Sequence, residues 1–356
     1  MGQLPITIMM RHSRNLQNMF KFTLIVLIAL ISGSAMSDEF TKSKIALSEG
    51  RKDDAIEALS NLVIAENAEA IYQTAMIYLG QPEPSSEDVN LGVSLMTKAA
   101  TLGHGFAEVR LGWILIDWMG KVGEGLRLLT NAADRGNNIA QGDLGVLYLR
   151  GDYVEPNIQT ALKYLKLAAN SGHVEALISL ADVFSNGVNL PTDYQKSLKY
   201  NLRALEQGSS KAKFNLAIMY SKGQGVEIDQ IKALDYLKAA AKDGISQAQV
   251  NLAAGYANGT FGTIDYTKAF KWYFEAAKQN DALAQNNLGL MYYYGQGIEK
   301  NLELALMWFI LGRHNGSSEA SENTEQLANK LSDEIIRSAN EKARQCFETN
   351  FIACPV

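Results

Sequence analysis

A column of alanines recurs through the second half of the chain with a fixed spacing of 36 residues. Its members are Ala140, Ala176, Ala212, Ala248, Ala284 and Ala320. In the first five copies, a leucine follows four positions later, a small residue five later and an aromatic residue eight later. These offsets place the four residues on one face of an α-helix. A period of this length is typical of a solenoid, in which adjacent copies of one supersecondary unit complete each other's core.

A second helix follows in every copy. Three positions after the aromatic residue stands a glycine, which can end a helix in the left-handed conformation; the five are Gly151, Gly187, Gly223, Gly259 and Gly295. Each next helix is preceded by a preferred N-cap residue: Asn157, Asp193, Asp229, Asp265 and Asn301. In the second helix, spacings of three and four predict one buried face, for example Ala269, Trp272 and Ala276. Gly172, Gly208, Gly244 and Gly316 close the unit, and Asn280 replaces glycine in the same column.

Two less regular copies precede Ala140. The copy around Ala107 is shortened by three residues, and the copy around Ala70 is lengthened by one. We therefore predict an all-α, right-handed solenoid of about seven helix-turn-helix repeats over residues 70–319. Helical caps are expected at residues 36–69 and 320–356, because a solenoid needs polar outer ends.

The pattern A-x-x-x-L-G-x-x-Y-x-x-G followed by K-A-x-x-W-x-x-x-A-A-x-x-G resembles the Sel-1-like repeat family, a relative of tetratricopeptide repeats. The resemblance is clearest from Ala248 to Asn280 and from Ala212 to Gly244, and it covers about residues 70–319. It implies a right-handed superhelix that acts as an adaptor between proteins. For exported bacterial members it implies roles in the cell envelope, in regulation or in host contact.

The N-terminus has the pattern of a secretory signal. Residues 22–31 are uncharged and largely apolar, Lys21 precedes them, and the small residues Gly33 and Ala35 follow. We predict a signal peptide at residues 1–35 with cleavage after Ala35 and a periplasmic or secreted protein, with no membrane insertion afterwards. An uncleaved membrane anchor is the alternative, although a span needs about 20 apolar residues. Translation starts at Met1 or at Met19.

The two cysteines, Cys346 and Cys354, lie close together near the C-terminus. In an exported chain such a pair is expected to form a disulfide. The net charge is -5, and the first 35 residues contribute three basic residues and no acidic ones, so the rest of the chain is more acidic still. That balance argues against nucleic acid or an anionic membrane as the main partner, since both require a basic surface.

The sequence predicts no catalytic, cofactor or metal site. His104, His173 and His314 fall near the ends of second helices in different repeats, too far apart for a shared metal ion. The S-x-x-K pair Ser210 and Lys213 prompts comparison with a β-lactam-hydrolysing branch of the Sel-1-like family. That branch carries a disulfide in each repeat and companion S-D-N and K-T-G triplets, all of which are absent here.

Candidate partner-binding residues lie on the first helix of each repeat, which usually lines the concave face of a solenoid. Three positions after each alanine stand Asp143, Ser179, Asn215, Asn251 and Asn287, whose polar side chains are suited to holding a peptide backbone or a neighbouring loop. Surplus aromatic residues, Trp113, Trp118, Tyr293 and Tyr294, are suited either to a binding hot spot or to packing between repeats.

The expected function is that of an exported scaffold or adaptor that binds a protein or peptide, not that of an enzyme. Two alternatives are a regulator of a membrane sensor and a hydrolase or binder acting on peptidoglycan or β-lactams. The scaffold is favoured because the sequence contains no recognisable combination of nucleophile, base and orienting group.

Overall fold

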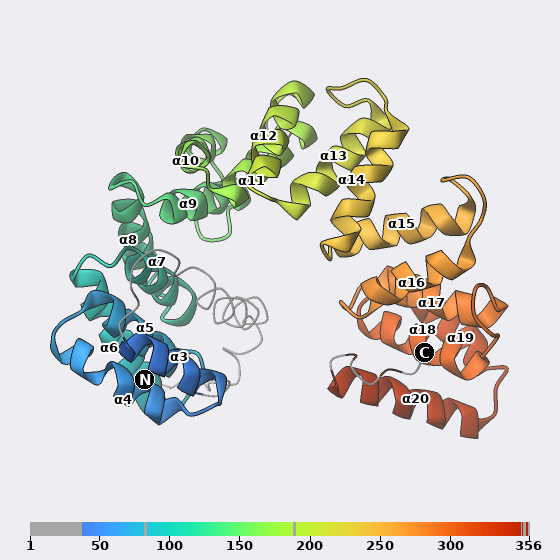
Figure 1. Cartoon of the computed structure of the whole chain (residues 1–356), viewed down its shortest axis with the longest axis horizontal. Helices are drawn as coiled ribbons and strands as arrows, with labels where there is room; N and C mark the ends of the chain where they lie inside the picture. The colour runs from blue at the N-terminus through green and yellow to red at the C-terminus, as the bar shows by residue number, and fades with distance from the viewer. Residues whose placement is uncertain (1–37, 82–83, 188–189, 350, 352–353, 355–356) are drawn as a thin grey trace. The chain divides into compact units, whose positions relative to one another are not determined.

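The structure is a computed structural model that describes residues 38–81, 84–187, 190–349, 351 and 354. Helices connected by short loops make up this part of the chain, and it contains no β-strand (Figure 1). The all-α prediction is confirmed. The chain divides into two compact units, one ending at Ala176 and the other beginning at Leu177. The predicted signal peptide, residues 1–35, lies outside the described residues.

From Asp38 on, where the described part of the first unit begins, a helix pair is followed by three repeats. Its helices are α3 (Asp38–Ser48), α4 (Lys52–Ile64), α5 (Ala68–Leu79), α6 (Ser86–Thr101), α7 (Gly105–Trp113), the π-helix η2 (Ile114–Trp118), α8 (Val122–Asp134), α9 (Asn138–Arg150) and α10 (Ile158–Asn170). Helices α5 and α6, α7 and α8, and α9 and α10 pack against each other in sequence order. This is the stacking that a solenoid requires.

The second unit continues the same alternation. Its helices are α11 (Val174–Asn186), which begins just before the boundary, α12 (Tyr194–Glu206), α13 (Ser210–Lys222), α14 (Gln230–Lys242), α15 (Ser246–Asn258), α16 (Tyr266–Ala277), α17 (Ala282–Tyr294), α18 (Leu302–His314), α19 (Ser318–Ala328) and α20 (Asp333–Glu348). We call the odd-numbered helices from α5 to α19 the A helices and the even-numbered helices from α6 to α18 the B helices.

The repeated columns form the core. Each of the six alanines spaced by 36 residues is at most 1% exposed, and the five leucines that follow them are 0% exposed. Burying a leucine side chain contributes about 1.5–3 kcal/mol, so this single column accounts for a large share of the stability. The five glycines after the aromatic residues have φ between 67° and 77°, and Asn280 has φ 64°. The predicted left-handed positions are therefore confirmed.

The predicted N-caps also hold. The side chains of Asn157, Asp193, Asp229, Asp265 and Asn301 each accept a hydrogen bond from the backbone N–H three residues later. In the three aspartate copies, the lysine at that third position pairs with the N-cap carboxylate and also lies over the aromatic ring of the preceding A helix. In one copy, Lys232 pairs with Asp229, and its Nζ lies 5.3 Å from the centre of the Tyr220 ring. Each copy thus ties helix B to helix A at the same place.

One detail differs from the sequence prediction. In α16 Tyr273, not Trp272, is buried, because Trp272 packs at the margin between two core clusters. His104 and His173 lie just beyond the ends of α6 and α10, as expected from the sequence. Each also caps the following A helix, with Nδ1 accepting the backbone N–H of Ala107 or Ala176. Imidazole nitrogen here replaces the oxygen of the Asn, Ser or Asp caps found in other repeats.

The C-terminal cap comprises α19 and α20, and α20 packs on α18. Its buried residues include Ala339, Ala343 and Cys346. The structure pairs Cys346 with Cys354, whose Cα atoms are 4.8 Å apart. The backbone N–H of Phe351 bonds back to the carbonyl of Cys346, so the chain turns over the end of the helix and Phe351 reaches the core against Trp308.

Candidate protein-binding surface

The polar column on the A helices does not behave as one uniform row. Two of its members, Asp143 and Asn215, are held by neighbouring side chains, whereas Ser179, Asn251 and Asn287 form no side-chain hydrogen bond with the described residues. The column therefore contains both structural positions and positions that remain available to a partner.

Asp143 is a structural position. Its carboxylate accepts a 2.7 Å hydrogen bond from the indole N–H of Trp113 in the preceding A helix. Burial raises the pKa of Asp143, an effect that the Trp113 hydrogen bond and the nearby charges of His173 and Arg110 reduce only in part. Trp113 and Asp143 were two separate candidates of the sequence prediction. Their hydrogen bond shows that both take part in packing between repeats.

The irregular repeat forms a further contact of the same kind. Tyr153 donates its hydroxyl to Asp117 of η2 at 2.5 Å, and its ring lies edge-on to Trp113. The bond to Asp117 raises the pKa of Tyr153 to about 12. Trp118, at the end of η2, packs against the core of the first unit. The aromatic surplus of this repeat therefore stabilises the stacking of α7 and η2 on their neighbours.

A simple register explains which members of the column are held. The residue three positions after the alanine faces the residue six positions after the alanine in the preceding repeat. Trp113 meets Asp143 in this way, and Asp182 accepts a hydrogen bond from Asn215. Asn215 also donates to Asn201 of α12. Asp182 also forms an ion pair with Lys211, so the polar groups of Asp182 and Asn215 are already paired within the protein.

The same register leaves Asn251 and Asn287 unpaired. The positions that would face them are Ile218 and Ala254, neither of which has a polar side chain. Asn251 is exposed and Asn287 is half-buried. Each amide presents two N–H donors and a carbonyl acceptor, the combination that pairs with the backbone of an extended peptide.

A small cavity lies beside this surface, between α17 and α19. Its volume is about 80 Å³, more than the roughly 10–15 Å³ that a single water requires by the same measure. The lining residues are Leu290, Tyr293, Tyr294, Phe309, Asn323, Gln326, Leu327 and Lys330. Tyr294 is 63% exposed, and its ring stands edge-on to that of Tyr293. The sequence identified the two tyrosines but not the cavity, because its far wall belongs to the terminal repeat.

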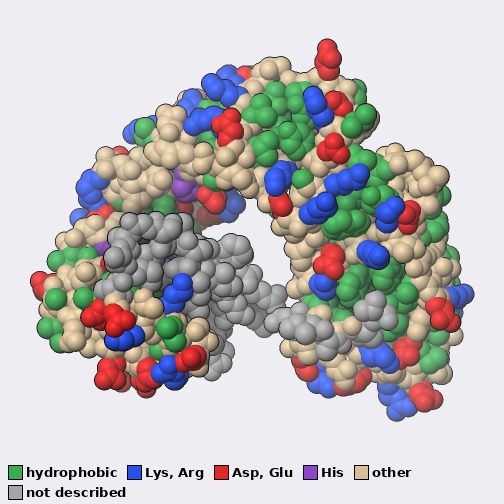
Figure 2. Space-filling view, in the orientation of Figure 1, with side chains coloured by type: hydrophobic (Ala, Val, Ile, Leu, Met, Phe, Trp, Pro, Cys, Tyr) green, Lys and Arg blue, Asp and Glu red, His purple; other side chains and the backbone are tan. Residues whose placement is uncertain are grey.

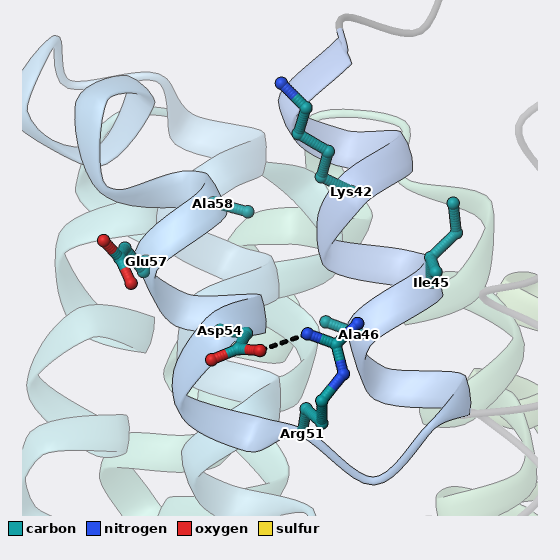
Figure 3. Close-up of a pocket in the computed structure, with 7 residues that line it drawn as sticks. All are labelled: Lys42, Ile45, Ala46, Arg51, Asp54, Glu57 and Ala58. Atoms are coloured by element: carbon teal, nitrogen blue, oxygen red, sulfur yellow. Dashed lines mark hydrogen bonds and ion pairs between the residues drawn. The ribbon is translucent and has the colours of Figure 1, made fainter.

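A wider groove lies on the N-terminal pair, between α3 and α4 (Figure 3). It has a volume of about 350 Å³ and is lined by Lys42, Ile45, Ala46, Arg51, Asp54, Glu57 and Ala58. Arg51, in the turn between the helices, pairs with Asp54 at its lower end, while Lys42 and Ile45 extend from α3 (Figure 3). No candidate residue of the sequence prediction lies in this groove.

The S-x-x-K pair is not arranged for catalysis. Ser210 donates its hydroxyl to Asp243 at 2.8 Å, and the ammonium group of Lys213 lies 2.5 Å from the same carboxylate oxygen. These contacts hold the pKa of Asp243 below its ordinary value, with the Lys213 hydrogen bond as the largest cause. Because the Ser210 hydroxyl donates to Asp243 and Lys213 is paired with the same carboxylate, Lys213 is not placed to act as a base toward the serine. The two residues instead link α13 to the end of α14.

The described residues hold no group of three or more His, Cys, Asp or Glu side chains placed to bind a metal ion. Among the helices of residues 38–349 that the structure places, none combines the length and the apolar run needed to cross a bilayer. In the space-filling view, side chains of both charges are scattered over the visible described surface, without one extended patch of a single sign (Figure 2). On this face, a surface for a partner is therefore defined by particular positions and not by bulk charge.

The Sel1 repeat matches residues 68–104, 138–173, 174–209, 210–245, 246–281 and 282–317, which together exceed half of the chain. Residues 105–137, the shortened copy that contains η2, lie between two of these matches. No curated protein matches the chain.

Solved structures that are similar to it include two Sel1 repeat (SLR) proteins. One is a protective antigen of uropathogenic Escherichia coli with an SLR fold, at 24% identity and a TM-score of 0.65, covering 88% of this chain and 69% of that one. The other is a Sel1 repeat protein from Oxalobacter formigenes, at 27% identity and a TM-score of 0.58, covering 67% of this chain and 99% of that one. Sel1 repeat proteins generally mediate protein–protein interactions, and their scaffold is generally non-catalytic. With six matching repeats on a helical solenoid, this chain belongs to the Sel1 repeat family.

Proposed function

We propose that this protein is an exported scaffold that binds a protein partner on the A-helix face of its second unit. The observation that carries the proposal is the pair of unpartnered amides, Asn251 and Asn287, in consecutive repeats. At Asp143 and Asn215 of the same column, side chains from the preceding repeat satisfy the polar group, whereas the hydroxyl of Ser179 is also unpartnered among the described residues. Two adjacent unpartnered amides on one face suit a ligand that completes the missing hydrogen bonds.

The cell envelope is the proposed location. The tripartite pattern at residues 1–35 supports export, and pairing of Cys346 with Cys354 is chemically consistent with an oxidising compartment. An adaptor there would act by bringing a partner to a fixed surface and would need no chemistry of its own.

Site-specific photo-crosslinking in intact cells would test the proposal. A benzophenone amino acid placed at Asn251 should capture a protein, which mass spectrometry would then identify. The same group placed at Lys271, an exposed position on B helix α16, should not capture that protein. Equal capture at both positions, or none at Asn251, would contradict the assignment of the A-helix face. Capture of a membrane sensor would identify the scaffold as a regulator of that sensor.

A further inference from the structure

Three successive A helices of the second unit, α13, α15 and α17, contain no aspartate or glutamate. The A helices that precede them all carry at least one carboxylate, such as Glu69 in α5 and Glu108 in α7. Lys211 and Lys213 in α13 are neutralised by Asp182 and Asp243. The face formed by these helices therefore presents amides, apolar groups and cations, and it lacks carboxylates of its own.

Unpaired lysines flank this face. The tenth position after the repeat alanine is exposed in four consecutive repeats and reads Lys222, Asn258, Tyr294 and Lys330. Lys222 and Lys330 form no ion pair with the described residues, whereas Lys211 and Lys213 at the start of α13 each have a carboxylate partner. Two ammonium groups left without a counter-charge favour an anionic ligand.

The cavity between α17 and α19 lies at the Lys330 end of this column. Its lining combines the apolar side chains of Leu290, Phe309 and Leu327 with polar ones, Lys330 among them. The glutamates of α19, Glu319, Glu322 and Glu325, do not line it. A cavity of this kind accommodates a large aliphatic side chain that has a carboxylate close by.

The positions of these residues set the shape of the ligand. Asn251 and Asn287 are one repeat apart, and Lys222 and Lys330 are three repeats apart. A ligand that contacts both lysines must therefore extend along the A helices from α13 to α19.

We propose, building on the function above, that the A-helix face from α13 to α19 binds an extended acidic segment of a partner protein. The amides of Asn251 and Asn287 hold the backbone of that segment. Its carboxylates pair with Lys222 and Lys330, and one large aliphatic side chain enters the cavity beside Tyr294.

A phage-displayed library of random 12-residue peptides, panned against the purified protein, would test this inference. Enriched peptides should share two or more acidic residues near a leucine, isoleucine or methionine. A fluorescein-labelled copy of the most enriched peptide should bind at least fivefold more weakly to Lys222→Glu and to Lys330→Glu, and more weakly to Tyr294→Ala. The matched control is Lys271→Glu, a charge reversal at an exposed lysine on B helix α16, and it should leave the affinity unchanged.

Three outcomes would overturn the inference: no enrichment, enrichment of basic or uncharged peptides, or acidic peptides whose binding is insensitive to both charge reversals. None of these would affect the capture of a partner at Asn251 in cells, so failure of the ligand chemistry is distinguishable from failure of the proposed function. Circular dichroism of each variant would verify that the helices are intact, as expected for substitutions of exposed side chains.

Discussion

Replacing Leu252 with alanine should lower the free energy of unfolding by about 2–5 kcal/mol. Leu252 lies in α15, is 0% exposed and shares its core cluster with Ala240, Ala241 and Ala248. The truncation removes three carbon atoms, which at about 0.8 kcal/mol each gives roughly 2.4 kcal/mol of lost transfer free energy. Because the other buried members of this cluster are alanines, whose side chains are too short to fill the space, a cavity cost adds to that value.

Urea denaturation followed by far-UV circular dichroism would measure the change. The control is Leu283→Ala in α17, where the side chain is 51% exposed, and it should cost less than about 1 kcal/mol. A loss below about 1 kcal/mol for Leu252→Ala, or equal losses for the two variants, would show that the repeat column is not the core. Leu216→Ala should behave like Leu252→Ala, because Leu216 occupies the same column one repeat earlier and is also 0% exposed.

Three further predictions concern the caps, the cysteines and the buried carboxyl group. Asp229→Ala should cost about 1 kcal/mol by removing the N-cap of α14, and Asp229→Asn should restore most of it; equal losses in a thermal melt would contradict the cap. Cys346 and Cys354 should not react with an alkylating reagent under denaturing conditions unless a reductant is added first, and mass spectrometry showing rapid labelling without it would exclude the disulfide. Burial raises the pKa of Asp143, so the folded state binds more protons than the unfolded state between the ordinary aspartate pKa of about 3.9 and the raised value, and stability falls as pH increases through that window. Asp143→Asn, which keeps an acceptor for Trp113, should therefore be stabilising at pH 7 and lose this advantage below about pH 4; an advantage independent of pH in urea titrations would refute the assignment.

Most of the fold could be predicted from the sequence because the same physical requirement recurs in every copy. A left-handed glycine such as Gly223 and an N-cap such as Asp229 are local features, and their recurrence in five copies makes chance agreement implausible. The signal peptide and the export that it implies stay predictions.

The candidate site was less accessible to sequence reasoning. Whether a polar side chain is free depends on what the neighbouring repeat places opposite it, and Asp143 and Asn287 look alike in the column although only Asp143 is held. A comparison of residues 33 positions apart would have found the pairing, since it links Asp182 with Asn215 and leaves Asn251 opposite Ile218. No spacing in the sequence indicated the cavity beside Tyr294. Several residues that line it, such as Lys330, belong to the C-terminal cap, whose sequence does not follow the repeat pattern.

The closure of the C-terminus also has a mechanical consequence. Helix α20 is fastened at its far end by the Cys346–Cys354 link, whereas α3 and α4 leave an open groove and have no covalent tie. In a repeat protein each helix pair contacts only the adjacent pairs, so local unfolding begins at the less stable end and proceeds one pair at a time. Local unfolding, and with it proteolytic cleavage, should therefore start near Asp38 and proceed toward the A-helix face that we propose binds a ligand. The Cys346–Cys354 disulfide helps to keep that face folded.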